Sequence, residues 1–236
     1  MAGPECYDCA MRAAFAMQSA MLEQRIEFEL TKAVLALDQL ARAIGDGGYE
    51  SSEAVSREGE RLKRAVRKLD SDLVVTIARQ APVASDLRLV LALLALGQCG
   101  CLIANQFVLI GDHLREIDPH VPGCHVVADQ LCCMALLTGS QLRQATKAFA
   151  LRDLGLAERV EFEDDEIDEL NRQIFKTTLA LGDAVERRTT GFRYVLIARS
   201  LERIGDNAVD IAEQAAFLLT AQLHEFSDAS RPRSIV

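Results

Sequence analysis

The chain has 236 residues, of which half are apolar and 26% are charged, a composition typical of a globular protein and not of a disordered one. Its net charge of −9 argues against nucleic-acid binding, because few basic side chains are available to displace counterions from a phosphate backbone. An acidic chain instead favours cations or basic protein surfaces as partners. Tryptophan is absent and proline is rare, and the long segments of 3.6-residue periodicity predict an all-α protein.

The start of the chain and its cysteines indicate a cytoplasmic protein. The first ten residues lack the basic and apolar regions of a secretory signal, so we expect none. Seven scattered cysteines, an odd number, favour free thiols in a reducing compartment. Cys6 and Cys9 form a CxxC pair without a second pair at zinc-site spacing. We interpret this pair, and the group of His120, Cys124 and His125, as structural rather than metal-binding.

Apolar periodicity and helix-breaking residues divide the chain into two sets of three helices. The first set is predicted at 13–44, from Ser51 or Ser52 to about 80, and from Ser85 or Asp86 to about 116. The segment 118–123 (DPHVPG) is the longest breaker within the chain. Beyond it, helices are predicted at 124–151, 155–188 and 191–223. We therefore expect an internal repeat, with an N-terminal extension (1–10), a first domain (11–117), a second domain (124–223) and a disordered tail (224–236).

The stretch 201–213, LERIGDNAVDIAE, aligns three acidic side chains along one helix face. Glu202, Asp206 and Asp210 stand at i, i+4 and i+8, opposite an apolar stripe. Like charges at this spacing destabilise an isolated helix by about 0.2–0.5 kcal/mol per pair. The stripe therefore needs solvent, a basic neighbour or a cation. A solvated face with Arg199 and Arg203 nearby is the alternative to a cation site.

Three motifs together resemble the PhoU family of regulators attached to bacterial phosphate-specific transport. They are LERIGDNAVDIAE, the DDEID at 164–168 and the QAPVASDLR at 80–88, and the MRAAF at 11–15 is similar to that family's usual start. The resemblance covers about residues 11–223. It implies two tandem three-helix bundles, a cytoplasmic homodimer and repression of the phosphate-starvation response. It also implies two partners, the ATPase subunit of the phosphate transporter and a sensor histidine kinase.

The resemblance further implies a metal cluster on the bundle surface, held by acidic pairs on neighbouring helices. In the second bundle, the matching residues are Asp164, Asp168, Glu202, Asp206 and Asp210. The first two lie in a segment, 161–169, that has seven carboxylates in nine residues. An all-oxygen site suits hard cations, with iron first and Mn²⁺, Mg²⁺ or Ca²⁺ as alternatives. Asn207 and Glu213 are further oxygen donors nearby.

The first bundle departs from this pattern at all five corresponding positions, which are Gly59, Lys63, Cys101, Asn105 and Leu109. We predict that it binds no cluster and that Lys63 supplies the positive charge there. No charged residue occurs between residues 88 and 112, but polar residues and glycines interrupt this run, so we expect no transmembrane segment. Instead, the face bearing Cys101, Asn105 and Leu109 should contact a second copy of the chain or a regulatory partner.

Enzymatic activity finds no support in the sequence. A carboxylate-bridged di-iron enzyme requires Glu-x-x-His pairs, and no glutamate stands three residues before a histidine. No nucleophile elbow or P-loop occurs, and Gly205 lies within a predicted helix, where it permits close helix packing or leaves room beside the acidic site. Apart from a PhoU-like adaptor, the hypothesis that stays open is a diverged, metal-free helical scaffold that has lost phosphate signalling.

Overall fold

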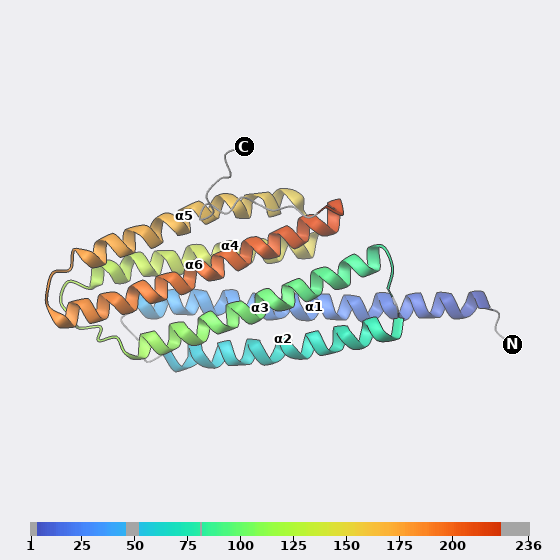
Figure 1. Ribbon diagram of the computed structural model, residues 1–236, viewed down its shortest axis with the longest axis horizontal. Coiled ribbons are helices and arrows are strands. Elements are labelled where there is room, and N and C mark those ends of the chain that lie inside the picture. The colour runs from blue at the N-terminus through green and yellow to red at the C-terminus, as the bar shows by residue number, and fades with distance from the viewer. Residues whose placement is uncertain (1–3, 46–51, 81, 223–236) are drawn as a thin grey trace.

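The computed structural model describes residues 4–45, 52–80 and 82–222, with side chains from residue 12 onward. Six α-helices make up nearly all of this part, and it contains no strand. They are α1 (Pro4–Gly45), α2 (Ser52–Gln80), α3 (Ser85–Arg115), α4 (His125–Leu151), α5 (Leu154–Leu179) and α6 (Val185–Thr220). The first three and the last three form successive helical groups (Figure 1), which confirms the predicted fold of two tandem three-helix bundles.

Helix α1 is longer than its apolar periodicity predicts. The pattern predicts a start near residue 13, whereas α1 begins at Pro4 and has 42 residues. Proline suits the first turn of a helix because the N–H that it lacks has no partner there. Residues 4–10, which the sequence assigns to an extension, therefore continue α1, and this end projects beyond the other helices (Figure 1). The predicted tail, 224–236, lies outside the described residues.

The turn between α5 and α6 corrects the sequence prediction. The predicted helices end at 188 and begin at 191, but α5 ends at Leu179 and α6 begins at Val185. Gly182 has a φ of +87°, which glycine adopts without the penalty of a Cβ atom, so the turn forms there. Gly191 instead lies inside α6, where a Cβ atom would stand 2.7 Å from the methyl group of Thr178. This glycine serves close packing and not a turn.

The two helical groups share one hydrophobic core. A single cluster of buried apolar side chains includes residues from all six helices. Helix α3 packs against α6, and α1 packs against α4, in addition to the contacts within each group. The predicted boundary, 118–123, is a short turn in which the His120 N–H donates to the Asp118 carboxylate at 2.9 Å. It separates the groups in sequence, but their cores are continuous.

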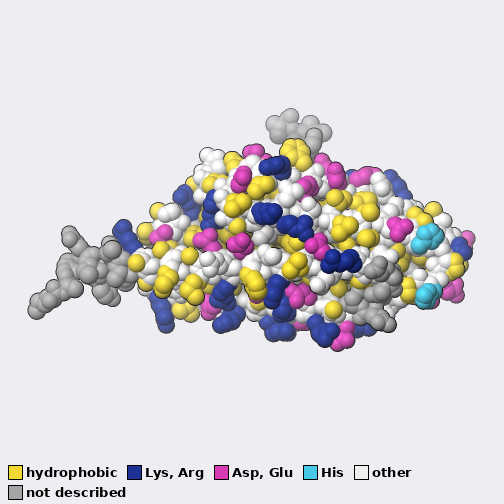
Figure 2. Space-filling model, turned by 180° about the vertical axis from the view of Figure 1, so that it is seen from behind, with side chains coloured by type: hydrophobic (Ala, Val, Ile, Leu, Met, Phe, Trp, Pro, Cys, Tyr) yellow, Lys and Arg dark blue, Asp and Glu magenta, His cyan; other side chains and the backbone are white. Residues whose placement is uncertain are grey.

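Ion pairs join the two groups at the surface. Arg143 of α4 pairs with Asp38 of α1 at 2.9 Å, and Arg152 pairs with Glu23 of α1. Arg193 of α6 pairs with Glu116 at the end of α3. Seen from behind Figure 1, the surface carries basic and acidic side chains interspersed with apolar ones (Figure 2), so the negative net charge does not dominate this face.

Helix α3 is the most apolar helix of the described chain. By length and composition alone it qualifies as a candidate membrane span, and half of its most apolar window is buried inside the protein. The buried half packs on α2 and α6. Its outer face exposes three leucines by 41–48%: Leu91, Leu102 and Leu109.

Candidate metal centre

Three of the five predicted ligands are deeply buried carboxylates. Asp164 and Asp168 on α5 and Glu202 on α6 retain only 8%, 6% and 7% of their exposure, respectively. Acidic side chains are almost never buried to this extent unless they are paired. Helices α5 and α6 pack against each other, and a Cβ atom on Gly205 of α6 would lie 3.4 Å from Asp164 Oδ1, so Asp164 lies where the two helices meet. Their burial sets them apart from the other acids of segment 161–169.

The remaining two predicted ligands are less buried. Asp206 is half-buried, and Asp210 is exposed. The charge of Asp210 reaches Cys99 of α3, where it adds to the effect of burial in raising the pKa of that thiol to about 12. Asp210 therefore lies toward the seam between α3 and α6. The acidic stripe of α6 continues past the buried acids to this seam.

Asp164 has a partner that the sequence did not identify. Gln141, a fully buried side chain of α4, donates a hydrogen bond from Nε2 to Asp164 Oδ1 at 2.9 Å. Its Oε1 atom is buried without a hydrogen-bond partner among the described residues. A Cβ atom at Gly205 would approach this Oε1 atom at 2.9 Å and Asp164 Oδ1 at 3.4 Å. Gly205 therefore packs closely on its neighbours and also leaves room beside Asp164, which are the two roles that the sequence leaves open for it.

Arginines neutralise part of the buried charge. Arg199 donates to the Glu202 carboxylate, as the sequence predicts for this residue. Arg203 is exposed, and its backbone carbonyl accepts a hydrogen bond from Asn207 Nδ2 at 2.6 Å. Arg172 Nη1 lies 3.7 Å from Asp168 Oδ2, a contact that the sequence analysis missed. Its signal was the i,i+4 spacing of the two residues on α5.

A second glutamine of α4 approaches the same acidic segment. Gln144 donates to Glu163, and burial raises the pKa of this carboxyl above its usual range. Gln141 and Gln144 stand three residues apart on the helix face toward α5. The sequence reasoning missed both because it searched only for acids. The signal that would have identified them is a pair of glutamines at i,i+3 on one face of α4.

The three buried carboxylates already contact glutamine or arginine side chains. Within the described residues, no three His, Cys, Asp or Glu side chains are grouped in an arrangement that would hold a metal ion. The residue types nevertheless fit a hard cation, because the donors are carboxylate oxygens and three of the acids are withdrawn from solvent. The residues that would hold it are the five predicted from the sequence: Asp164, Asp168, Glu202, Asp206 and the exposed Asp210.

In the first helical group, the corresponding positions of α2 and α3 face each other. Lys63 Nζ donates to Asn105 Oδ1 at 2.9 Å, so lysine and amide stand where the second group has Asp168 and Asp206. Gly59 packs so closely on α3 that a Cβ atom would lie 2.7 Å from the carbonyl oxygen of Ala104. An aspartate at that position would have no room without movement of α3. The contact between Lys63 and Asn105 supports the alignment of the first helical group with the second, in which these two positions correspond to Asp168 and Asp206.

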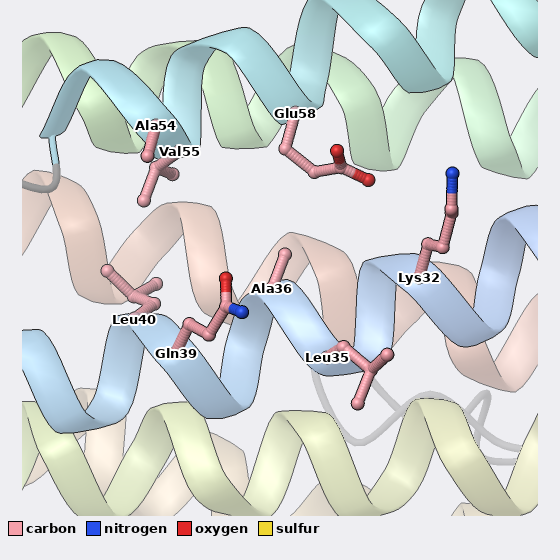
Figure 3. A pocket seen from close by; sticks show the side chains of 8 residues that line it. All are labelled: Lys32, Leu35, Ala36, Gln39, Leu40, Ala54, Val55 and Glu58. Atoms are coloured by element: carbon pink, nitrogen blue, oxygen red, sulfur yellow. The ribbon is translucent and has the colours of Figure 1, made fainter.

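The cysteines and a surface hollow lie apart from the acidic residues. Cys124 is a buried free thiol, whereas the side chains of Cys6 and Cys9 lie outside the described part. A hollow of about 250 Å³ between α1 and α2 is lined mainly by apolar side chains, with Lys32 and Glu58 at one end (Figure 3). It belongs to the first group, so it is not an extension of the acidic site.

Comparisons with known proteins place the chain in a family. The family model of the PhoU domain matches residues 131–215. A phosphate-specific transport system accessory protein PhoU homolog of Caulobacter vibrioides is 31% identical over 178 residues, covering 72% of this chain and 74% of that protein. A homolog of the same description from Methanothermobacter thermautotrophicus is 27% identical over 179 residues, covering 73% and 79% of the two chains.

Solved structures share the fold. The phosphate transport system regulatory protein PhoU from Streptococcus pneumoniae superposes with a TM-score of 0.78 and 21% identity, covering 89% of this chain and 99% of the other. PhoU from Pseudomonas aeruginosa gives a TM-score of 0.61 and 22% identity, covering 90% and 99%. These structures show that the helical arrangement is that of known PhoU proteins. The chain belongs to the PhoU family.

Proposed function

We propose that this chain is a non-enzymatic, cytoplasmic regulator that represses phosphate uptake and the phosphate-starvation response. The observation that carries the proposal is its membership of the PhoU family, whose relatives from Caulobacter and Methanothermobacter are named accessory proteins of phosphate-specific transport. Its partners are the ATPase subunit of the phosphate transporter and a sensor histidine kinase, as the resemblance implies. In this role the chain acts by binding and not by catalysis.

The second helical group, in this proposal, holds a metal ion or cluster, with iron first and Mn²⁺, Mg²⁺ or Ca²⁺ as alternatives. Support comes from three carboxylates that are more than nine-tenths buried on two adjacent helices. A bound cation would supply the positive charge that so many buried carboxylates require. Asp164 and Asp168 would then hold α5 to Glu202 and Asp206 of α6. The first group needs no cation, because Lys63 already occupies the corresponding place.

A metal-free scaffold is the second candidate, and a specific observation favours it. The buried acids already have partners in this chain: Gln141 for Asp164, Arg172 for Asp168 and Arg199 for Glu202. If these contacts suffice to stabilise the carboxylates, the acidic face needs no metal. The two candidates differ in whether the purified protein retains a cation.

We propose the outer face of α3 as the surface for partner or dimer contact. Of the three residues that the sequence analysis assigns to this contact, Leu109 is exposed, whereas Cys101 is only partly exposed and Asn105 accepts a hydrogen bond from Lys63 of α2. Leu91, Leu102 and Leu109 expose 48%, 42% and 41% of their surface along one side of the helix. Exposed apolar side chains in a row are a feature of protein interfaces. A Leu102→Glu/Leu109→Glu variant should lose association in analytical ultracentrifugation or binding to the transporter ATPase while keeping its helical content. Retention of both interactions would exclude this face.

Elemental analysis of protein purified without chelator or affinity-tag metal tests the cation. We expect the wild type, supplied with iron, manganese and magnesium, to retain a tightly bound metal and a Glu202→Ala/Asp206→Ala variant to lose it. The Lys63→Ala variant is the matched control and should retain the wild-type metal content. A metal-free wild type under these conditions would contradict the cation site and leave the scaffold. Circular dichroism of each variant verifies folding.

The regulatory role is tested in a strain that lacks the gene and carries a reporter driven by a phosphate-starvation promoter. Wild-type protein should restore repression in phosphate-rich medium. The metal-site variant should fail to do so although it accumulates to the same level. Full repression by the metal-site variant would separate the regulatory role from the cation, and no repression by the wild type would reject the role itself.

A further inference from the structure

A fully buried glutamine of α4 lies beside the candidate metal centre. The exposure of Gln141 is 0%, although glutamine side chains are mostly found at protein surfaces. It reaches Asp164 across the packed faces of α4 and α5. Among the described side chains of α1, the first helix of the other group, Ser19 is the sole buried polar one. A buried amide therefore accompanies the acids of the second group and is missing from α1 of the group that lacks them.

Two acceptors fix the orientation of the Gln141 amide. Its Nε2 atom donates to Asp164 Oδ1 at 2.9 Å and to the backbone carbonyl oxygen of Val160 at 3.4 Å. An amide turned by half a rotation would place Oε1 against a carboxylate oxygen and a carbonyl oxygen, and none of these three atoms can donate a hydrogen bond. The NH₂ group therefore faces α5, and Oε1 faces away from these two acceptors.

The Oε1 atom of Gln141 borders a space that Gly205 of α6 leaves open. A Cβ atom on Gly205 would lie 2.9 Å from Oε1 and 3.4 Å from Asp164 Oδ1, so both oxygens border the same space. Oε1 is buried and accepts no hydrogen bond from the described residues. Gly205 directly precedes Asp206, one of the predicted ligands. A buried acceptor that lacks a donor, among carboxylates on two other helices, is suited to a cation.

We propose that Gln141 is a ligand of the cation through Oε1, so that the metal centre is built from α4, α5 and α6. This inference rests on the proposed cation site of the second group. Amide oxygens are common ligands of hard cations, and they add an oxygen donor without adding negative charge. The hydrogen bond from Nε2 to Asp164 holds the amide in place, as is usual for the groups around a metal.

Isothermal titration calorimetry of the metal-free full chain with Mn²⁺ and, under nitrogen, with Fe²⁺ tests this ligand. Gln141→Leu has a similar volume and removes both polar atoms, so it should weaken metal binding at least about tenfold. Gln141→Glu loses the N–H donor but keeps a side-chain oxygen for the metal. It should bind at least as tightly as the wild type, because the cation also relieves repulsion between the new carboxylate and Asp164.

Gln144→Leu is the matched control on the same face of α4. Gln144 donates to Glu163, which is outside the predicted ligand set, so its loss should leave metal affinity unchanged. Circular dichroism and thermal unfolding of the metal-free variants verify that each one folds. A weaker affinity in Gln144→Leu equal to that of Gln141→Leu would show a general effect of removing glutamine from α4, and would overturn the specific role of Gln141.

The remaining outcomes separate the role of Gln141 from the cation site itself. Wild-type affinity in Gln141→Leu would overturn the ligand while leaving the cation site. Equal weakening by Gln141→Leu and Gln141→Glu would assign the loss to the N–H donor, and would also overturn the ligand role of Oε1. A wild type that binds neither Mn²⁺ nor Fe²⁺ would reject the cation site, and the ligand with it.

Discussion

Two glycines show how a missing side chain shapes each helical group. Gly205 leaves room for Gln141 and Asp164 beside the candidate cation site, where a Cβ atom would meet only the ends of side chains. Gly59 lies against the backbone of α3, where a Cβ atom would meet the Ala104 carbonyl oxygen. Gly205 leaves space beside Asp164, whereas the close packing of α3 on Gly59 leaves no space for an acidic side chain at that position.

The close contact at Gly59 makes a direct prediction. Gly59→Ala should lower the free energy of unfolding by about 1–2 kcal/mol, because overpacking outweighs the gain in helix propensity. Gly155→Ala is the control in α5, since the nearest atom to its Cβ would be Asp153 Oδ1 at 3.4 Å. It should be neutral or stabilise by up to about 1 kcal/mol. Urea unfolding followed by circular dichroism measures both, and an unchanged Gly59→Ala would contradict this packing.

The difference in burial predicts that Cys99 reacts more slowly than Cys133. Cys99 is buried, and burial together with the charges of Asp210 and Glu213 raises its pKa to about 12, whereas Cys133 is exposed. At pH 8 the Cys99 thiolate is therefore about a thousandfold scarcer than that of an ordinary thiol. We expect mass-spectrometric mapping after brief alkylation of the native protein to find Cys133 modified and Cys99 intact. Rapid labelling of Cys99 before unfolding would contradict its burial.

At the scale of helices, turn chemistry determines where α5 ends. Apolar residues continue at helical spacing past the end of α5, so periodicity alone carries the prediction through to residue 188. The left-handed backbone of Gly182 ends it earlier. Arg187 then donates to the carbonyl of Leu181 at 3.2 Å and satisfies a backbone group that the turn leaves without a helical partner.

The left-handed backbone of this turn predicts that replacing Gly182 by alanine destabilises the protein. Gly182→Ala should reduce the free energy of unfolding by about 1–2 kcal/mol, because φ is +87° and a Cβ atom there would contact nothing within 4 Å. Gly123, with φ of +86° and equally open surroundings, is the matched site in the turn before α4. Its alanine variant should show a similar loss in thermal unfolding. A neutral result at both sites would exclude left-handed backbone in these turns.

At the scale of the whole molecule, the repeated halves form one packed unit. The α1–α4 and α3–α6 contacts bury apolar surface between the groups, and ion pairs from Glu23, Asp38 and Glu116 reinforce them. A helix such as α3, which is apolar on most faces, therefore packs on partners from both groups. The hydrophobic core therefore crosses the boundary between the two groups.

We accordingly expect the protein to unfold in a single transition. Leu62→Ala in α2 and Leu142→Ala in α4 each remove a fully buried side chain and should cost about 2–5 kcal/mol. Each should lower the midpoint of the same transition in differential scanning calorimetry, because the core is shared. Two separable transitions, with one variant affecting only one of them, would show that the groups unfold independently.

The sequence by itself determined the helices, their grouping and the positions that carry acids. Helix formation and the i,i+4 stacking of Glu202 and Asp206 are local, so periodicity reveals them. The sequence alone likewise shows that Gly59 and Lys63 stand where the second group has acids. The family motifs, which are contiguous in sequence, were recognisable for the same reason.

Only the tertiary structure decided which of these acids are buried and what contacts them. Gln141 lies on α4, far in sequence from Asp164, and its role depends on how α4 packs against α5. Burial and the contact with Gln141 arise from side chains distant in the chain, so no local pattern specifies them, whereas the pairs Arg172–Asp168 and Arg199–Glu202 are local. The packing of α5 and α6 thus decides which acids of the two helices are withdrawn from solvent.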